Sequence, residues 1–372
     1  GRIGGVFAAG LVLGVVEAVS VYFIGASYQQ VVGLVLFILL LMFRPQGLFT
    51  RKGGGVSSSA ENLPSASYAF SQKISISEGW SFNALKEAIT EKRFFIIGIL
   101  IAVCCLLPLV IKSDYLINLF ILLFLYISIT QSWNILGGYT GQISIGQSAF
   151  LGIGALSTRL LWMSGAPIFL ALLAGGVSAV VLAAIIGLPS LRLRGVYFAI
   201  GTLGLAIIMR VIVGNVFPGV SFLPAKYLAS FTLTPRYYVA LVLVLVTIGA
   251  AYLLVNSRLG LGMIAVKEDE EAAAATGINT FKCKVLALTV STFLAGLAGG
   301  VYAFYSAVYY YFVPFELIWS FEPVLIVIIG GAGTIIGPIL GAIGYVALKE
   351  LFTVTIGRFS VPIFAILFII TV

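Results

Sequence analysis

The chain has 372 residues, of which 61% are hydrophobic and only 9% are charged, and its mean hydropathy is +1.15. Because charged residues make up about a quarter of a typical soluble domain, this composition excludes an ordinary soluble protein and predicts a polytopic membrane protein. The net charge of +8 is read as an excess of cationic residues in loops, which sets orientation in the membrane, and nucleic-acid binding is not expected.

Catalytic and metal-binding chemistry is weakly represented in the sequence. Histidine, the commonest metal ligand and general base, does not occur. The spacing of Cys104, Cys105 and Cys283 supports neither a zinc site nor a disulfide framework. No phosphate-binding loop of the GxxxxGK[ST] type occurs either. We therefore expect no catalytic residue, metal or cofactor, and any ATP hydrolysis would take place on another chain.

The first 93 residues divide into two apolar segments and a polar connector. Residues 3–24 and 28–43 are apolar, and the basic residues that follow from Arg44 place the end of the second segment in the cytoplasm. Residues 50–93 contain glycine, serine and basic residues but no long apolar run, which predicts a flexible cytoplasmic linker. The chain starts without methionine and ends inside an apolar run, so we expect both ends to be cut.

Ten further apolar segments follow this linker. They lie at about 94–111, 115–136, 144–164, 167–188, 195–214, 237–255, 284–306, 321–332, 337–353 and 360–372. Because roughly 17 to 25 apolar residues cross a bilayer as a helix, we expect an all-α polytopic membrane protein with about ten or more transmembrane helices. Counting crossings places residues 256–283 in the cytoplasm and 215–236 outside. Clustered glycines could make 321–337 a broken or re-entrant element.

Acidic residues cluster in the loop between the apolar runs that end at 255 and begin at 284. Four consecutive acidic residues, Glu268 to Glu271, precede an alanine run that ends near Gly277. Carboxylates suit the N-terminal end of a helix and glycine suits a left-handed C-cap, so a short helix is expected. Such a helix is marginal alone and needs a surface to pack on. The loop is therefore either a solvated connection or a docking helix for a cytoplasmic partner.

A second notable stretch runs from Gly137 to Phe150 and contains polar residues within a membrane-embedded region. Its polar side chains must find partners within the helix bundle or face water, because lipid offers none. One interpretation is a seam of small residues at which helices pack, as the GxxxG spacing at 296–300 also predicts. The other is that the stretch lines a translocation path. The candidate residues for the path are Gly141, Gln142, Ser144, Gly146 and Gln147.

Ionisable residues inside the apolar segments give little support to proton-coupled transport and are only weak evidence against sodium coupling. Arg159 and Arg210 are expected near the ends of their spans, where long side chains can reach the membrane interface. No acidic residue with an evident partner recurs near the middle of a span. This pattern disfavours a proton relay and an integral-membrane enzyme.

Four motifs occur in the order found in one transporter family. Glu271-Ala272-Ala273 with Gly277 fits the EAAxxxG signature of ABC-importer permeases. The other three are TGQISIGQSAFLGIGA, GLPSLRLRGVYFAIGTL and GGAGTIIGPILGA. Together they resemble the second permease subunit of the branched-chain amino acid ABC importers, over about residues 94–353. Residues 1–49, which end in FRPQGLF, resemble the C-terminal end of the sister permease subunit, as in a fused pair whose second permease domain is 94–372.

The resemblance implies a function, partners and a location. It implies an ATP-driven permease of a bacterial or archaeal inner membrane that moves a branched-chain amino acid by alternating access. The implied partners are ABC ATPase subunits, the sister permease unit, an extracytoplasmic solute-binding protein and membrane lipid. Glu271, Ala272, Ala273 and Gly277, in the coupling loop 256–283, would dock on the ATPase.

Two departures from the family pattern leave the solute open. Gln147 stands where such permeases usually carry histidine, and the segment from Asn215 to Pro224 lacks a TGGxxG-like pattern. Related permeases are thought to serve urea and short-chain amides, so these solutes are the first alternative. A channel or ion-coupled carrier that works without an ATPase is the second, and in that case the acidic loop is merely solvated.

Overall fold

The structure is a computed structural model. It describes residues 101–111, 113–191, 193, 195–224, 227–228 and 231–356, and isolated residues at 15–16, 19–20, 28, 31–32, 34–35 and 98–99. The expected apolar segments at 3–24 and 28–43 lie largely outside the described residues, and the linker 50–93 and the segment from 360 onward lie wholly outside them. The chain divides into two units, Gly1–Leu48 with Ser113–Val372 and Phe49–Lys112. In the second unit the structure describes one apolar helix, Ile101–Val110.

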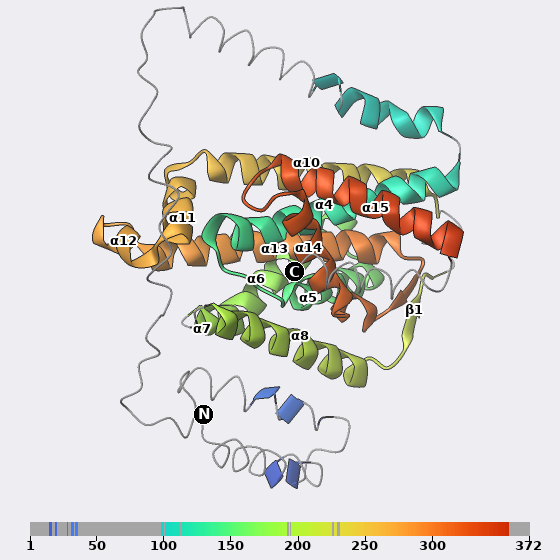
Figure 1. The fold of residues 1–372 in the computed structure, drawn as a ribbon. Coiled ribbons are helices and arrows are strands. Elements are labelled where there is room, and N and C mark those ends of the chain that lie inside the picture. The colour runs from blue at the N-terminus through green and yellow to red at the C-terminus, as the bar shows by residue number, and fades with distance from the viewer. Residues whose placement is uncertain are drawn as a thin grey trace, which may run out of the picture. The chain divides into compact units, whose positions relative to one another are not determined.

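The larger unit is built almost entirely of helices (Figure 1). Its main helices are α4 (Asp114–Thr140), α5 (Gln147–Met163), α6 (Ile168–Leu182), α8 (Val196–Val216), α10 (Leu233–Val255), α11 (Arg258–Glu268), α12 (Glu270–Ala275), α13 (Thr280–Tyr305), α14 (Ile318–Gly330) and α15 (Ile336–Ile356). Shorter elements are a π-helical turn η2 (Ala183–Gly187), α7 (Leu188–Ser190), the strands β1 (Val220–Phe222) and β2 (Val308–Tyr310), and a 3₁₀ turn η3 (Val313–Phe315).

Six of the described helices are long and apolar enough to cross a membrane. They are Asp114–Thr140, Ile168–Gly187, Val196–Val216, Leu233–Val255, Thr280–Tyr305 and Ile336–Thr353. Each contains an 18-residue window of high hydropathy with at most two ionisable residues, which is the composition that hydrocarbon requires. The expectation of a helical, polytopic membrane protein is confirmed.

Helix α13 lies at the centre of the larger unit and contacts α4, α5, α6, α10 and α11. Glycines set the close approach of these helices. A Cβ atom on Gly154 would lie 2.2 Å from the backbone oxygen of Gly296, and one on Gly299 would lie 1.9 Å from that of Leu151. The expectation that the glycines at 296–300 mediate helix contact is therefore confirmed.

The expectation of an all-α fold is wrong in one detail, because β1 and β2 form a small antiparallel sheet. Val220 pairs with Tyr310 and Phe222 with Val308. These strands follow the C-terminal ends of α8 and α13, where the chain leaves the helices. Pairing satisfies the backbone groups that a helix no longer satisfies there.

Arg159 holds this sheet to the helices, and the expectation that it reaches the membrane interface is wrong. Its side chain is fully buried. The guanidinium donates from Nε to Ser221 Oγ (3.0 Å), from Nη2 to Ser221 O (2.9 Å), and from Nη1 to the carbonyls of Ala303 and Ser306 (both 3.2 Å). The backbone carbonyls of Ser221, Ala303 and Ser306 thus accept the hydrogen bonds that water would accept from the guanidinium at the membrane interface. Tyr309 stacks beside it, and burial raises the pKa of that phenol, so the hydroxyl stays neutral.

The glycine-rich segment after α14 is a broken element. Helix α14 has 13 residues, with Pro323 inside it, so its length is only about 20 Å at 1.5 Å per residue. Gly331 (φ 111°) and Gly333 (φ 79°) then turn the chain into α15. Of the two possibilities for 321–337, a plain span or a broken element, the structure contains the second.

Candidate functional site

The acidic loop folds into two helices where the sequence predicted one. Ser257 caps α11, and its side chain accepts a hydrogen bond from Gly260 N (3.1 Å). Asp269 is extended between the helices and caps α12, because its Oδ1 accepts from Glu271 N (2.8 Å) and Ala272 N (3.0 Å). Helix α11 was missed, although serine before a run containing leucine, methionine and valine is a recognisable N-cap signal.

Gly277 ends α12 as expected, in a left-handed turn. Its φ is 88°, and its N–H donates to Ala274 O (3.0 Å), while Ile278 N donates to Ala273 O (3.1 Å). These two bonds make up a Schellman motif, which satisfies the last carbonyls of the helix. A short helix is thereby given fixed ends on both sides.

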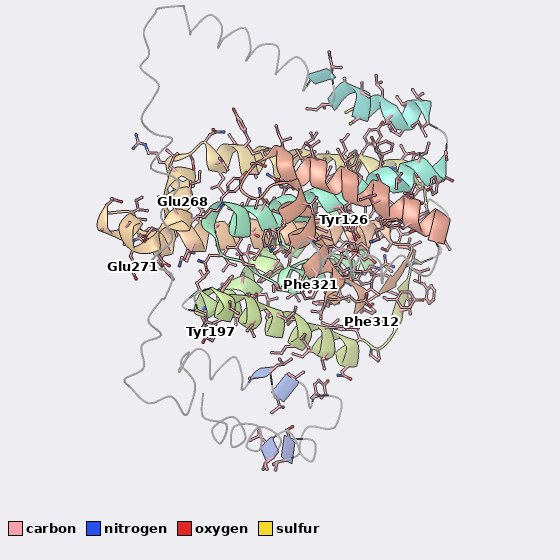
Figure 2. The ribbon with its side chains drawn as sticks, in the orientation of Figure 1. Tyr126, Tyr197, Glu268, Glu271, Phe312 and Phe321 are labelled. Atoms are coloured by element: carbon pink, nitrogen blue, oxygen red, sulfur yellow. The ribbon has the colours of Figure 1, made fainter. Side chains whose placement is uncertain are left out.

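Helix α12 is anchored on one face and exposed on the other. Ala273 is buried, whereas Glu271 and Ala272 are exposed. Glu270 forms an ion pair with Lys284 (2.7 Å), and the Lys284 side chain is only 4% exposed, so α12 is tied to the start of α13. Figure 2 shows Glu268 and Glu271 at one end of the larger unit. Of the four residues predicted to dock, Glu271, Ala272 and Gly277 are therefore exposed on this turn, whereas Ala273 packs inward.

Helix α11 joins this turn to three long helices, because it contacts α4, α10 and α13. Lys267 lies against Gly141 at the end of α4: a Cβ on Gly141 would lie 3.7 Å from that of Lys267. A Cβ on Gly333 would in turn lie 3.2 Å from Lys267 Nζ. One lysine of α11 therefore reaches both the end of α4 and the break between α14 and α15.

The five residues predicted to line a path lie in or beside the non-helical link between α4 and α5. Gly141 has a φ of 68° and is exposed next to α11, and Gln142 is half-buried. Ser144 is fully buried: its carbonyl accepts from Trp133 Nε1 (2.6 Å) and its Oγ accepts from Gly146 N (3.2 Å). A Cβ on Gly146 would meet the Thr202 carbonyl at 2.5 Å. Ser144 and Gly146 therefore hold the link against α4 and α8.

Gln147 begins α5 and lies deep in the bundle. Its Nε2 donates to Ser132 Oγ of α4 (2.5 Å), and its Oε1 has no hydrogen-bond partner among the described residues. Gln131, one residue before Ser132, makes no close hydrogen bond through either amide atom, although the Tyr139 hydroxyl lies near it, and both glutamines are fully buried. A buried polar group without a partner costs about 1–3 kcal/mol, which a fold tolerates when the group has another use. Gln131 was not among the predicted site residues.

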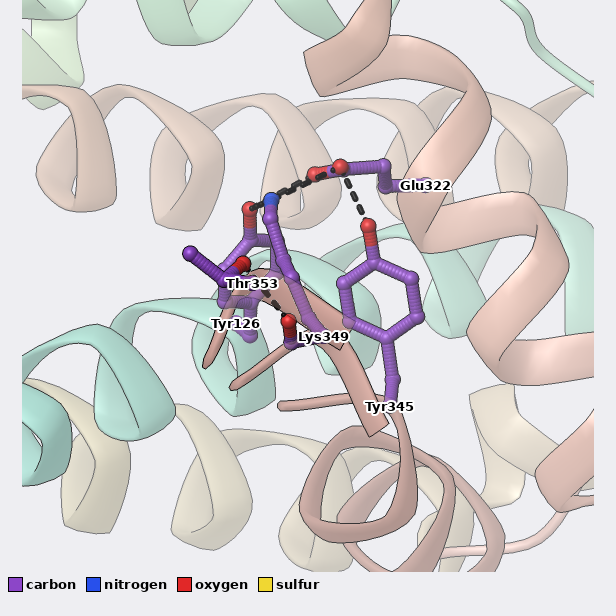
Figure 3. Close-up of polar contacts among 5 residues, drawn as sticks. All are labelled: Tyr126, Glu322, Tyr345, Lys349 and Thr353. Carbon is purple, nitrogen blue, oxygen red and sulfur yellow. Dashed lines mark hydrogen bonds and ion pairs between the residues drawn. The ribbon is translucent and has the colours of Figure 1, made fainter. Parts of the chain in front are cut away.

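A partly buried ion pair was also not predicted from the sequence (Figure 3). Glu322 of α14 accepts from Lys349 Nζ of α15 (2.9 Å) and from the Tyr126 hydroxyl of α4 (2.6 Å). The Tyr345 hydroxyl donates to the same carboxylate, and Lys349 also donates to the Tyr126 oxygen (2.8 Å). Glu322 is thus an acidic residue inside an apolar segment that does have a partner, which the sequence did not make evident.

The ion pair was missed because its members are far apart in sequence. Glu322 and Lys349 are separated by 27 residues, and Tyr126 and Glu322 by 196. The available signal was Glu322 itself, an acidic residue within the apolar run IWSFEPVLIVIIG. In the structure the carboxylate has a cation and two phenol donors, so the cluster links α4, α14 and α15. These four side chains hydrogen-bond to one another, and by themselves they do not form a proton-transfer chain.

Several apolar spans around a buried polar interior, with a capped helical loop at one end, define a multi-pass membrane protein. A family model described as the permease component of the branched-chain amino acid transport system matches residues 115–372, and the chain belongs to this family. It is accordingly a permease component for branched-chain amino acid transport, located in the inner membrane.

Curated relatives carry the same description. The chain is 28% identical over 305 residues to the high-affinity branched-chain amino acid transport system permease protein LivM of Escherichia coli (strain K12), covering 72% of this chain and 70% of that one. The LivM protein of Salmonella typhimurium is 26% identical over 305 residues, which again cover 72% of this chain and 70% of that one. A probable LivM of Methanocaldococcus jannaschii is 29% identical over 98 residues, which are 26% of this chain and 28% of that protein. No solved structure matches the chain.

Proposed function

We propose that this permease is driven by ATP hydrolysis on separate ABC ATPase subunits and imports a branched-chain amino acid by alternating access. The observation that carries the proposal is α12, a short helix with fixed ends whose exposed surface contains Glu271 and Ala272. A helix of six residues would not persist alone in water, so its caps and its ion pair to Lys284 keep a projecting turn in place. A rigid, exposed turn is what a partner with a matching groove requires.

We propose that ATPase movement enters the bundle through two contacts. The ion pair between Glu270 and Lys284 passes it to α13, as expected for the span that follows the coupling loop 256–283. The contact of Lys267 with Gly141 and the Gly333 turn passes it to α4 and to the break before α15. Gly141, Gln142, Ser144, Gly146 and Gln147 would then move with the link between α4 and α5 along the solute path.

The surrounding assembly follows the same proposal. Residues 1–49 would be the last helices of the sister permease, joined by the cytoplasmic linker 50–93 to the permease domain 94–372, with ten or more transmembrane helices in total. The partners would be two ATPase subunits, an extracytoplasmic solute-binding protein and membrane lipid. The relatives described as branched-chain amino acid permeases support the choice of solute.

Urea or a short-chain amide is the second candidate solute. The observation in its favour is that Gln147 Oε1 and both amide atoms of the buried Gln131 lack a hydrogen-bond partner among the described residues. Carboxamides hydrogen-bond to urea through both a donor and an acceptor. Uptake of labelled leucine and of labelled urea by the same cells decides between the two solutes.

The test of coupling is co-purification. The full chain is extracted gently from its membrane, and the ATPase that accompanies the wild type is compared with that accompanying Glu271→Arg. We expect the substitution to release the ATPase, because it reverses the charge of an exposed residue on α12. Asp114→Arg, which makes the same charge change at the exposed start of α4 and outside the coupling loop, is the control and should retain the ATPase. If no ATPase accompanies the wild type, the chain works as a channel or ion-coupled carrier and the proposal is wrong.

A further inference from the structure

A groove lies between the C-terminal half of α8 and the residues just before η3. Its volume is about 320 Å³, and it is lined by Ile207, Arg210, Val211, Gly214, Asn215 and Phe312. This volume is at the lower end of the range for small-molecule pockets. The groove is open on one side.

Two opposite charges stand together at this groove. Arg210 Nη2 lies 4.0 Å from Glu316 Oε1, and the two side chains are 45% and 36% exposed. At this distance and exposure the pair is weak, and each charge can accept another partner. Arg210 lies in the C-terminal third of α8, a helix long and apolar enough to span the membrane, so its long side chain can reach the membrane interface.

The frame around the groove is rigid. Phe315 of η3 is fully buried and packs in one cluster with Val213 of α8. Gly152 of α5 makes room for the Phe315 ring, since a Cβ there would lie 2.4 Å from it. The pairing of β1 with β2 further ties the end of α8 to the chain that leads into η3. Phe312 and Glu316 are thereby held at fixed positions beside Arg210.

We propose that this groove binds the solute as a zwitterionic amino acid with an apolar side chain. Arg210 would accept the carboxylate, Glu316 would accept the ammonium group, and Ile207, Val211 and Phe312 would contact the side chain. The proposal rests on the function proposed above and adds the site and the ionic form of the solute. A planar guanidinium suits a carboxylate, and the adjacent carboxylate completes the complement of an amino acid.

The same arrangement disfavours other solutes. A simple anion would be repelled by Glu316, and a simple cation by Arg210. Urea can hydrogen-bond to both side chains, but it is neutral and gains less from a charge pair than a zwitterion does. The apolar lining along one face of α8 gains only from a solute with an aliphatic side chain.

The groove and the docking turn are far apart, so each can be altered alone. Phe312 lies toward the opposite end of the larger unit from Glu271 (Figure 2). A substitution at the groove should therefore leave ATPase co-purification intact. This separation distinguishes failure of the groove proposal from failure of the coupling proposal.

The experiment measures equilibrium binding of radiolabelled leucine to the full chain, purified in lipid nanodiscs with the subunits that accompany it and without a solute-binding protein. Arg210→Gln and Glu316→Gln should each raise the Kd roughly tenfold or more, since each removes a charged hydrogen-bond partner. Asp114→Asn, an equivalent carboxylate change at the exposed start of α4, should leave the Kd unchanged. The leucine analogue 4-methylpentanoate, which lacks the ammonium group, should not compete.

A second variant tests the apolar wall without touching the charges. A Cβ on Gly214 would lie 4.0 Å from Phe312 Cβ, so a side chain fits there and projects into the groove. Gly214→Val should weaken leucine binding roughly tenfold and alanine binding much less, because it narrows the wall. If both charge variants bind leucine within twofold of the wild type, or the wild type binds none, the groove is not the solute site. Retained ATPase in that case leaves the coupling proposal standing.

Discussion

At the scale of single residues, glycines decide how closely the central helices lie. Gly299 of α13 faces the backbone of α5, whereas Gly249 of α10 faces open space, where a Cβ atom would have nothing within 4 Å of it. The two positions cannot be distinguished in the sequence, since each is a glycine within an apolar helix. Their packing environments predict opposite effects of an added methyl group on stability.

Gly299→Ala should destabilise the protein by about 1–3 kcal/mol, because its methyl group would overlap the Leu151 carbonyl, 1.9 Å away, and push α5 from α13. Gly249→Ala is the matched control and should be neutral or stabilising by up to about 1 kcal/mol, since alanine favours a helix. Thermal unfolding in detergent, followed by helical circular dichroism, checks both. Equal midpoints for the two variants would show that α5 and α13 can separate at no cost.

At the scale of elements, the buried carboxylate of Glu322 holds three helices together. Its partners come from α4 and α15, and Trp319 of α14 also stacks on Tyr126 at a ring distance of 5.7 Å. The cluster therefore fixes the short helix α14, which is too short to span a membrane and needs lateral support. The attraction between Glu322 and Lys349 adds little to the free energy of unfolding, but removing one partner leaves the other charge uncompensated and destabilises the protein.

Removing one member should cost more than removing both. Glu322→Gln leaves Lys349 without its carboxylate and should lower the free energy of unfolding by about 1–3 kcal/mol, less than for a fully buried pair because the Lys349 side chain is 37% exposed. Glu322→Gln with Lys349→Met should recover most of the loss. A double-mutant cycle on thermal unfolding measures the coupling, and strictly additive effects would argue against the ion pair.

Local elements could be predicted from the sequence better than their contacts could. The spans followed from hydropathy, and the left-handed end of α12 followed from Gly277, since both depend on neighbouring residues. The Glu322–Lys349 pair, the Arg159 bonds to β1 and the Arg210–Glu316 groove join residues far apart in the chain. Arg159 was predicted to reach the membrane interface because snorkelling is the usual fate of such residues, and only the fold reveals the carbonyls that hold it inside.

At the scale of the whole molecule, the docking turn and the interior communicate through α11. Lys267 touches the end of α4 at Gly141 and the turn at Gly333, and α11 also contacts α10 and α13. If α11 must move relative to α4 during each cycle, a covalent bond between them should stop transport while leaving the ATPase attached. The distance between the two positions makes that test possible.

Gly141→Cys combined with Lys267→Cys should form a disulfide that blocks uptake. Their Cβ atoms would lie 3.7 Å apart, close to the mean of about 3.8 Å in disulfides. Gly141→Cys alone controls for the strain of a side chain at a φ of 68° and for pairing with the free Cys283. Oxidation should abolish leucine uptake in the double variant only, and reduction should restore it. Full uptake by the oxidised, cross-linked protein would mean that α11 and α4 move as one body and that coupling runs through α13.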